Sequence, residues 1–495
     1  MAVRVTNREI QCRANRFARA LDAIGVPTRG VVAGLLPNVA EFVYCLRGAT
    51  WSGRTFTPVN WHLSARDIAY IVENSEACVL VTHAQFAEMA ESLAPTIRSE
   101  ARFAVGGDIP GFRAFEEIDD YSEDDLENPL AGTLMLYTSG TTGKPKGVKT
   151  DRLTDQLPPC PTSQMGSAML STCLKEGAAG THLVVAPLYH AAPPTYSEGA
   201  ALLGAEVIIM EGWDAEEFLR LVDTEKVAST FMVPTHFVRL LQLPEETRAK
   251  YDVSSLKLVC HGAAPVSPGV KRRMIDWLGP VLFEFYGGTE GGGVSIDSHD
   301  WLARPGSVGK PRPGLEVHIL DPEGNPLPAG DTGDVFFRSA GKRFEYKDDP
   351  EKTASAYRGE LYTLGDIGYL DEEGFLYLCD RRADIIISGG VNIYPAEIEA
   401  VLLEHPGVQD CCVVGIHDEE WGERILAVIQ PRADGSGARE LTDQLQQLCK
   451  DQLGHQQRPR EFAYSQSLPR TETGKLLRRE VRDHYRAQLE SAEDG

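Results

Sequence analysis

The sequence predicts an α/β fold spread over more than one domain, and three observations carry that prediction. Short apolar runs rich in β-branched residues alternate with amphipathic helical segments along most of the chain, which is typical of parallel sheets with helices packed on them. After about residue 305 the pattern changes to strands joined by Asp-Gly, Glu-Gly and proline-rich turns, which indicates antiparallel structure. A chain of 495 residues is also too long for one hydrophobic core.

The first helix and strand show how the elements are assigned. Between Thr6 and Gly25 apolar residues recur at helical spacing, so we expect a helix that Thr6 caps at its N-terminus and Gly25 closes. The run "VVAGLLP" that follows is expected to be a buried strand. The same reasoning assigns further short strands to "ACVLVTH", "HLVVAP", "AEVIIME" and "LKLVCHG".

A smaller α+β pattern begins at Pro395. We expect a helix at "AEIEAVLLEH", strands at "DCCVVGIHD" and "RILAVIQ", and a second helix at "RELTDQLQQLCKDQLG". This second change of pattern agrees with the prediction of more than one domain.

Composition and charge narrow the function classes. Apolar residues make up 42% and charged residues 24% of the chain, as in ordinary globular proteins, and the formal net charge is -23. This acidity argues against nonspecific binding to nucleic acid or to anionic membranes, because both require a basic face. A phosphate ligand is not excluded, since a few basic side chains and backbone N–H groups can dominate one cleft.

Cysteine usage and the N-terminus favour a cytoplasmic protein without a membrane span. The 10 cysteines are scattered, with no CxxC pair and no zinc spacing, which is typical of buried reduced thiols. The start, "MAVRVTNREI", contains no apolar signal core. No stretch reaches the length of about eighteen uninterrupted apolar residues that a membrane helix needs.

The stretch "YTSGTTGKPKGVKT" (Tyr137–Thr150) has the composition of a phosphate-binding loop. The run "TLMLY" that leads into it is expected to be a strand, and Thr138–Lys144 a turn in which Gly140 and Gly143 let the backbone approach an anion. It is not a Walker A loop, because Pro145 stands where that loop has a Mg²⁺-binding Ser or Thr.

Other catalytic templates have little support. The run "GGTEGGG" lacks the GxGxxG spacing of a Rossmann dinucleotide site. The chain contains neither HExxH nor GxSxG, so zinc-hydrolase and serine-hydrolase interpretations are disfavoured.

Several motifs in a fixed order resemble those of the adenylate-forming superfamily, which comprises acyl-CoA synthetases, luciferases and peptide-synthetase adenylation domains. The chain is most similar to the acyl- and aryl-CoA ligases. Besides the loop above, the matching segments are "YGGTEGG" (Tyr286–Gly292), the ribose and hinge segment Tyr362–Glu399, and "LPRTETGKLLRRE" (Leu468–Glu480).

The resemblance implies a large N-terminal domain of two α/β subdomains plus a small β-barrel, followed by a smaller, mobile α+β lid domain. We place the N-terminal ATP- and acid-binding domain at residues 1–382. The C-terminal lid domain, which carries the catalytic lysine, is placed at residues 383–495.

The same resemblance implies a nucleotide site. The phosphate loop would close over the β- and γ-phosphates of ATP, where its donors offset charge on the departing pyrophosphate. Adenine would pack on Tyr286, and Asp366 would accept hydrogen bonds from the ribose hydroxyls with Arg381 beside it. The loop residues are Thr138, Ser139, Gly140, Thr141, Thr142, Gly143 and Lys144. Those lining the adenine are Gly262, Ala263, Ala264, Pro265, Glu284 (near the amino edge), Phe285 and Gly287.

The resemblance also implies the catalytic groups. Thr289 would contact the α-phosphate, and Glu290 would hold Mg²⁺, a hard cation suited to carboxylate. Lys475 would bridge the substrate carboxylate and the α-phosphate, because attack requires the repulsion between these two anions to be offset. The expected cofactors are therefore ATP, Mg²⁺ and coenzyme A.

The implied reaction is attack of a carboxylate on the α-phosphate, which gives acyl-AMP and pyrophosphate. A rotation of the lid then admits coenzyme A, whose thiol displaces AMP, with Ser388, Gly389 and Gly390 on the coenzyme A side. The hinge departs from the family pattern, since Ala383 stands where Asp or Lys is usual. An adenylation-only enzyme that passes acyl-AMP to a separate ligase or carrier protein is therefore an open alternative.

The segment "APLYHAAPP" bears on the acid. Peptide-synthetase adenylation domains usually carry an Asp near this segment and this chain has none, so amino-acid activation is disfavoured. Tyr189 and His190 are expected at the acid pocket, together with Gly287 and Gly288. His190 either acts at the pocket mouth or is a structural histidine, and His236 either lines the pocket or packs behind it. Aromatic, bulky polycyclic and medium-chain acids all stay open, and we favour aryl or bulky acids.

The expected partners are a small carboxylic acid, ATP and coenzyme A, with no nucleic acid, and the chain is expected to be a monomer or a homodimer. A luciferase-like oxygenase is disfavoured, because nothing in the sequence specifies oxygen chemistry. A non-catalytic scaffold on this fold would be expected to lack Glu290 or Lys475, and both residues are present.

Overall fold

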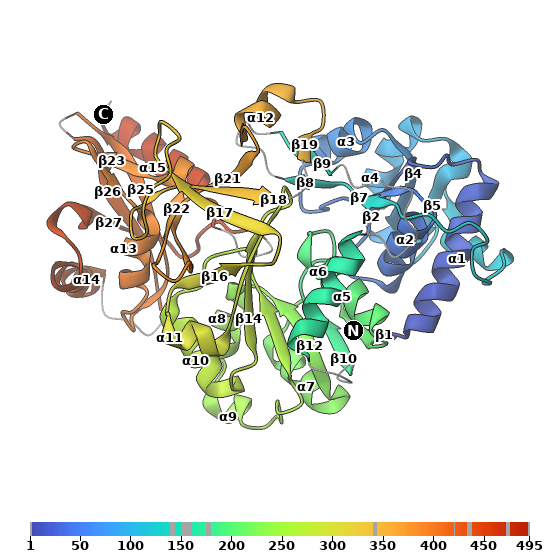
Figure 1. Ribbon diagram of the computed structural model, residues 1–495, viewed down its shortest axis with the longest axis horizontal. Coiled ribbons are helices and arrows are strands. Elements are labelled where there is room, and N and C mark those ends of the chain that lie inside the picture. Colours follow the sequence, from blue (N-terminus) through green and yellow to red (C-terminus); the bar gives the residue numbers. More distant parts are fainter. Residues whose placement is uncertain are drawn as a thin grey trace.

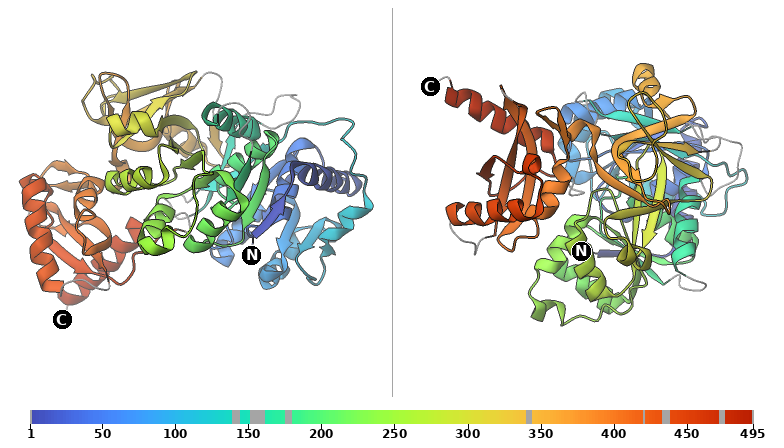
Figure 2. Two further views of the ribbon diagram at one scale, coloured as in Figure 1. Left: turned by 90° about the horizontal axis from the view of Figure 1, so that it is seen from below. Right: turned by 60° about the vertical axis from the view of Figure 1, so that its left-hand side comes forward.

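The computed structural model describes residues 2–138, 144–150, 161–174, 180–339, 344–419, 421–432, 438–471 and 476–493. Within these residues, three sheets build a large N-terminal domain and a fourth sheet builds a smaller C-terminal domain (Figure 1). In both views of Figure 2 the C-terminal domain is a body of its own at one side of the molecule.

The first sheet is an α/β layer formed by the N-terminal part of the chain. Its six strands have the order β6-β5-β4-β2-β3-β7, and all of its pairings are parallel. The strands are β2 (Val31–Leu35), β3 (Thr55–Pro58), β4 (Ala77–His83), β5 (Arg102–Val105), β6 (Arg113–Ala114) and β7 (Thr133–Leu134). The accompanying α-helices are α1 (Asn7–Ala23), α2 (Ala40–Trp51), α3 (Ala65–Asn74) and α4 (Ala87–Leu93).

Helix α1 confirms the reading of the first segment. The N–H of Glu9 donates to the Thr6 hydroxyl at 3.1 Å, so Thr6 caps the helix as expected. Phe17 and Leu21 are fully buried on its apolar face. Gly25 follows the helix with a φ of 72°, a left-handed conformation that glycine adopts without steric cost.

The second sheet extends from the other α/β layer into antiparallel structure. Five neighbouring strands, β11-β10-β12-β13-β14, are parallel, and β15, β16, β22, β21, β18 and β17 continue the same sheet in antiparallel order. The parallel strands are β10 (Thr181–Val184), β11 (Glu206–Met210), β12 (Val227–Met232), β13 (Leu258–His261) and β14 (Leu282–Gly287). The antiparallel ones are β1 (Ala2–Val5) beside β11, β15 (Gly292–Asp297), β16 (Ser307–Pro311), β17 (Leu315–Leu320), β18 (Gly333–Ser339), β20 (Tyr357–Arg358), β21 (Leu361–Leu370) and β22 (Leu376–Arg381).

The helices of this layer are α5 (Pro161–Cys173), α6 (Ala192–Leu202), α7 (Ala215–Glu225), α8 (Pro234–Gln242), α9 (Glu245–Arg248), α10 (Pro268–Leu278) and α11 (Ser298–Ala303). Helices α6 to α10 connect the parallel strands of this layer, as parallel pairing requires, while α5 precedes β10 and α11 lies between the antiparallel strands β15 and β16. The predicted change from parallel to antiparallel strands is confirmed, but the antiparallel strands prolong the second sheet instead of starting a new one. Closure of these strands into a barrel stays a prediction.

A third, small sheet corrects one sequence prediction. The run "TLMLY", expected to be one strand, divides into β7 and β8 (Leu136–Thr138), which belong to different sheets. Met135 lies between them because its backbone N–H bonds to Phe56 while its side chain is buried in the core. Strand β8 then pairs with β9 (Lys146–Thr150), which pairs with β19 (Phe344–Tyr346), ahead of helix α12 (Pro350–Ser355).

The C-terminal domain has its own sheet and its own cores, as the α+β pattern from Pro395 predicted. Its strands follow the order β24-β23-β26-β25, with β27 beside β26. They are β23 (Ile386–Ser388), β24 (Val391–Ile393), β25 (Val408–Asp418), β26 (Gly422–Pro431) and β27 (Glu461–Tyr464), with helices α13 (Pro395–Leu402), α14 (Ala438–Gln452) and α15 (Arg478–Glu493). Two hydrophobic clusters of this domain contain only residues that follow Asp384.

Among the residues that the structure describes, no helix is both long enough and apolar enough to cross a lipid bilayer.

Candidate active site

Several of the predicted site residues follow the carboxyl ends of neighbouring parallel strands in the second sheet. Tyr189 and His190 follow β10, and His236 lies in α8, directly after β12. The loop Gly262–Pro265 follows β13, and the turn Gly288–Gly291 follows β14. The carboxyl edge of an open α/β sheet is where such folds bind ligands, so this edge is the candidate active site.

The loop after β13 runs close to β14 because two residues allow it. A Cβ on Gly262 would lie 2.5 Å from the carbonyl oxygen of Phe285, so only glycine fits there. Ala263 has a φ of 69°, which an L-residue adopts at a cost. Strain of this kind gathers at ligand sites, and here it turns the loop toward the end of β14.

Tyr286, Asp366 and Arg381, which were assigned to adenine and the ribose, form one connected group. Asp366 and Arg381 are paired across β21 and β22, and Arg381 Nε lies 2.8 Å from Asp366 Oδ1. The Tyr286 hydroxyl donates to the other carboxylate oxygen, Oδ2. Burial and the Asp366 charge both raise the pKa of Tyr286, so this hydroxyl stays protonated and remains the donor.

Thr289 and Glu290 occupy the two central positions of a tight turn between β14 and β15. The turn is closed on both sides, since Gly288 N–H donates to Gly291 O at 2.8 Å and Gly291 N–H donates to Gly288 O at 3.2 Å. The Glu290 Oε1 atom accepts a hydrogen bond of 2.9 Å from the hydroxyl of Tyr346, at the end of β19. Sequence reasoning missed Tyr346, whose distance from Glu290 along the chain gave no signal of contact.

The phosphate loop lies between the paired strands β8 and β9, with Thr138 opposite Lys146. Lys144 is exposed, and its Nζ lies 5.4 Å from the centre of the Tyr70 ring. The predicted loop residues Ser139, Gly140, Thr141, Thr142 and Gly143 lie outside the described residues, as does the predicted catalytic Lys475.

Glu284 was expected near the amino edge of adenine. In the structure, its carboxylate instead forms a buried ion pair with Lys271 of α10. The fully buried His261 ring lies beside them, with Nε2 4.0 Å from Glu284 Oε2. Burial raises the pKa of Glu284 and lowers the pKa of Lys271, while each charge opposes the shift of the other. Sequence reasoning missed Lys271, although its place on the same helical face as Met274 and Ile275 was a signal that it is buried.

An aromatic group surrounds the residues assigned to the acid. The rings of Tyr189 and His190 lie 4.5 Å apart, and Trp61 and His62 pack against Tyr189. Burial lowers the pKa of His190 to about 4, so the ring is neutral at physiological pH. Within the described part of the chain, the buried Nε2 atom of His190 has no hydrogen-bond partner.

For His236 the structure favours packing behind the pocket over lining it. The ring stacks on Trp213 with centroids 4.0 Å apart, and Nδ1 accepts a hydrogen bond from the N–H of Val233. His236 is 3% exposed, and burial lowers its pKa to about 3.

The hinge residue Ala383 lies between two ion pairs that point to different domains. Its predecessor Arg382 donates Nε to Asp334 Oδ1 of β18 at 2.6 Å. Its successor Asp384 lies 3.7 Å from Nε of Arg478 in α15. Ala383 therefore has a fixed neighbour on each side, although it has no polar group itself.

Ser388, Gly389 and Gly390 form the tip of a hairpin between β23 and β24. Both glycines have positive φ, 58° at Gly389 and 81° at Gly390, as a tight hairpin turn requires. A Cβ on Gly389 would also lie 2.7 Å from the Trp421 ring, so both the positive φ and this contact disfavour a side chain at this position.

The carboxylate of Glu290 is a suitable ligand for the Mg²⁺ ion that accompanies a nucleoside triphosphate. Apart from its bond to Tyr346, Glu290 accepts no hydrogen bond from the described residues, which leaves Oε2 for a hard cation. No group of three or more His, Cys, Asp and Glu that could hold a metal ion occurs in the described residues, and Mg²⁺ commonly binds through one or two carboxylates plus substrate phosphates.

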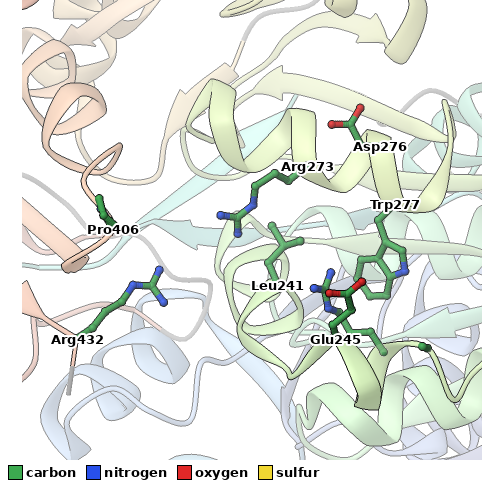
Figure 3. A pocket seen from close by; sticks show the side chains of 9 residues that line it. Leu241, Glu245, Arg273, Asp276, Trp277, Pro406 and Arg432 are labelled. Carbon is green, nitrogen blue, oxygen red and sulfur yellow. The ribbon is translucent and has the colours of Figure 1, made fainter. Parts of the chain in front are cut away.

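A cavity of about 820 Å³ opens between the two domains, but none of the predicted site residues lines it. Leu241, near the end of α8 that points away from β12, forms part of one wall, with Arg273 and Trp277 of α10. Pro406 and Arg432 of the C-terminal domain form the other wall, and Arg273 and Arg432 extend toward each other across the space (Figure 3). This cavity is therefore distinct from the acid pocket that the sequence predicts.

Comparisons with known proteins define the class. The family model described as AMP-binding enzyme matches residues 2–342, and that of the AMP-binding enzyme C-terminal domain matches residues 397–475. The chain therefore belongs to the AMP-binding enzyme family, the adenylate-forming enzymes that the motifs resemble.

Individual relatives agree along nearly the whole chain. A feruloyl-CoA synthase from Amycolatopsis sp is 32% identical, covering 97% of this chain and 94% of that protein. A fatty acid–[acyl-carrier-protein] ligase, ScoC, from Streptomyces coeruleorubidus is 29% identical, covering 97% and 92%. The amide bond synthetase McbA from Marinactinospora thermotolerans has a similar structure, with a TM-score of 0.84, 26% identity and coverage of 97% and 95%. These comparisons confirm the predicted superfamily, the enzyme class of AMP-forming acyl-CoA ligases, and the family's use of ATP, Mg²⁺ and coenzyme A.

Proposed function

We propose that this enzyme activates an aryl or other bulky carboxylic acid with ATP to give acyl-AMP, and then transfers the acyl group to coenzyme A. The observation that carries the proposal is the convergence of three groups at one sheet edge. They are the Tyr286–Asp366–Arg381 group, the Glu290–Tyr346 pair, and the aromatic group around His190.

In the first half-reaction we assign each residue by its chemistry. Tyr286 packs on adenine, and Asp366 exchanges its present bond from Tyr286 for bonds from the ribose hydroxyls, while its ion pair with Arg381 is retained. Thr289 donates to the α-phosphate, and Glu290 supplies a carboxylate oxygen to Mg²⁺. Lys475 lies between the substrate carboxylate and the α-phosphate and stabilises the charge that develops there.

The preference for an aryl or bulky acid rests on the group around His190. Aromatic rings offer a flat apolar wall, and the neutral His190 ring presents one unpartnered nitrogen to a polar substituent of the acid. The similar feruloyl-CoA synthase agrees with an aryl acid, whereas the similarity to a fatty-acid ligase keeps a medium-chain acid as the competing substrate class.

The second half-reaction depends on the lid. We place the domain boundary between residues 382 and 383, so that Arg382 stays with β18 while Asp384 moves with α15. Rotation at Ala383 brings the Ser388–Gly390 hairpin to the coenzyme A side. The similarity to an acyl-carrier-protein ligase and to an amide bond synthetase favours one alternative, in which acyl-AMP is passed to a carrier protein or an amine. A cytoplasmic location and a monomeric or homodimeric state remain predictions.

The test is ATP–pyrophosphate exchange across aryl, polycyclic and medium-chain acids, with product analysis in the presence and absence of coenzyme A. We expect the strongest exchange with aryl or bulky acids, and release of AMP with acyl-CoA once coenzyme A is added. Stable acyl-AMP without thioester would support the alternative. The variant Lys475→Ala should lose adenylation by several orders of magnitude while keeping its fold, and unchanged exchange in this variant would contradict the mechanism.

A further inference from the structure

We propose that Tyr346 is a positioning residue for adenylation. Its hydroxyl fixes one oxygen of Glu290, so that the other is presented to Mg²⁺, and its strand ties this carboxylate to the phosphate loop. The inference rests on the proposed function, because it takes Glu290 as the carboxylate that binds the metal.

The contact itself orients the carboxylate. Tyr346 donates to Oε1 of Glu290 at 2.9 Å, and Glu290 is held at the centre of the turn that Gly288 and Gly291 close. Oε2 faces Gly288, since a Cβ on that glycine would lie 2.9 Å from it. Because this residue is a glycine, no side chain stands between it and Oε2. One oxygen is therefore fixed by a hydrogen bond, and no hydrogen bond from a described residue reaches the other.

The strand of Tyr346 reaches the phosphate loop through one strand pairing. Tyr346 is opposite Val148 of β9, and β9 is the second arm of the β8–β9 hairpin that carries the loop. Lys146 strengthens this pairing, because its Nζ lies 2.9 Å from Asp349 and 5.8 Å from the centre of the Tyr346 ring. A shift of β19 would therefore move strand β9 and the Glu290 carboxylate together.

The next two residues anchor the strand to the first α/β layer. Lys347 is 7% exposed, and its Nζ lies 2.8 Å from Oε1 of Glu76. Asn74, at the end of α3, donates to Asp348 at 3.0 Å. Contacts with the second sheet, the third sheet and α3 therefore hold Tyr346 and its strand in place.

Outer-shell groups of this kind control metal affinity, because an unsupported carboxylate spreads over several rotamers and only some of them face the ion. Loss of an outer-shell hydrogen bond typically weakens metal binding about 10- to 100-fold. The hydroxyl of Tyr346 should therefore matter to Mg²⁺-dependent binding of the nucleotide, and much less to binding of the nucleotide without metal.

The experiment compares Tyr346→Phe with the wild type in calorimetric titrations of the full-length protein with α,β-methylene-ATP, with and without Mg²⁺. We expect Tyr346→Phe to reduce the Mg²⁺-dependent gain in affinity about tenfold and to change metal-free affinity by less than about twofold. Tyr357→Phe is the matched control, since the Tyr357 hydroxyl bonds to the backbone of Phe344 in the same strand, at 2.8 and 3.0 Å. This control should keep the wild-type gain.

The outcomes separate this inference from the proposed function when Glu290→Gln is measured alongside. Loss of the gain in Glu290→Gln with a full gain in Tyr346→Phe overturns the inference alone. A full gain in Glu290→Gln contradicts Glu290 as the metal-binding carboxylate and overturns both. An equal loss in Tyr346→Phe and Tyr357→Phe assigns the effect to the strand as a whole, and overturns the role given to the Tyr346 hydroxyl.

Discussion

At the scale of single residues, the buried pair of Lys271 and Glu284 has a direct consequence for stability. Lys271 is fully buried, and its Nζ lies 4.8 Å from the centre of the Trp301 ring. Two buried charges persist only when each has its partner, because the cost of removing them from water is otherwise not offset. Glu284 lies in β14, two residues before Tyr286.

Replacement of Lys271 by Met should lower the free energy of unfolding by about 3 kcal/mol or more, because the buried Glu284 carboxylate loses its partner. Adding Glu284→Gln should recover most of this loss, since the amide carries no charge. Chemical denaturation of both variants and of the wild type measures the cycle. A double variant as unstable as Lys271→Met would show that volume, and not charge, sets the cost.

The buried ring of His236 makes stability depend on pH. Its pKa is lowered to about 3 by burial, whereas an unfolded histidine has a pKa of about 6.5. Below pH 6.5 the unfolded state therefore binds a proton that the folded state does not. The free energy of unfolding decreases as the pH is lowered, by up to about 1.4 kcal/mol per pH unit.

Phenylalanine in place of His236 keeps a ring against Trp213 but cannot titrate. The decrease in unfolding free energy between pH 6.5 and pH 4 should therefore be smaller in His236→Phe than in the wild type. The difference should equal the free energy linked to uptake of about one proton by the unfolded state. Denaturation curves at a series of pH values measure the unfolding free energy of both proteins. The difference between them at pH 8, where histidine is neutral in both states, gives the effect of packing alone. Equal slopes in both proteins would contradict the assignment.

At the scale of elements, the lid hairpin between β23 and β24 distinguishes its two glycines. Alanine at Gly389 would face both a positive φ and a clash with Trp421, whereas alanine at Gly390 would face a positive φ with no atom within 4 Å. We expect Gly389→Ala to raise hydrogen exchange in β23 and β24 well above the wild type, and Gly390→Ala to raise it less. If the two variants exchange alike, contact with Trp421 does not set the shape of the hairpin.

At the scale of the whole molecule, the two ion pairs beside Ala383 determine how the lid is attached. Arg382 is bound to Asp334 in the N-terminal domain, and Asp384 is paired with Arg478 in the lid. In the proposed lid rotation, Ala383 has no polar group to stabilise either pose, and these neighbours would supply the fixed points about which its φ and ψ turn. The polar hinge that the family pattern leads one to expect is thus replaced by polar groups on either side.

The substitution Asp334→Asn should loosen the N-terminal side of this pivot. In the proposed mechanism the lid rotates after adenylation, so ATP–pyrophosphate exchange should change by less than about twofold, while acyl-CoA formation should fall several-fold. Parallel assays of the two half-reactions with the best acid test this expectation. A comparable loss in both assays would show that Asp334 supports the fold of the N-terminal domain and not the hinge.

The comparison of sequence and structure shows which local signals were sufficient. Thr6 and Gly25 bound helix α1 as expected, because capping and left-handed glycine depend on neighbouring residues only. The strand "TLMLY" was wrong as a single element, because its division at Met135 depends on a hydrogen bond to Phe56, about eighty residues earlier. For His236, the ring of Trp213 decided between two places that the sequence left open.

The sequence by itself determined the family, the class of chemistry and the positions of the motifs, because each motif is a short run whose residue types are set by the phosphate, ribose or metal it serves. Only the tertiary structure decided which residues support those motifs. The contacts of Tyr346 with Glu290 and of Arg382 with Asp334 join elements far apart in the chain, and that of Lys271 with Glu284 joins a helix to the strand that follows it. Such contacts follow from how sheets and helices pack, and packing leaves no local pattern in the sequence.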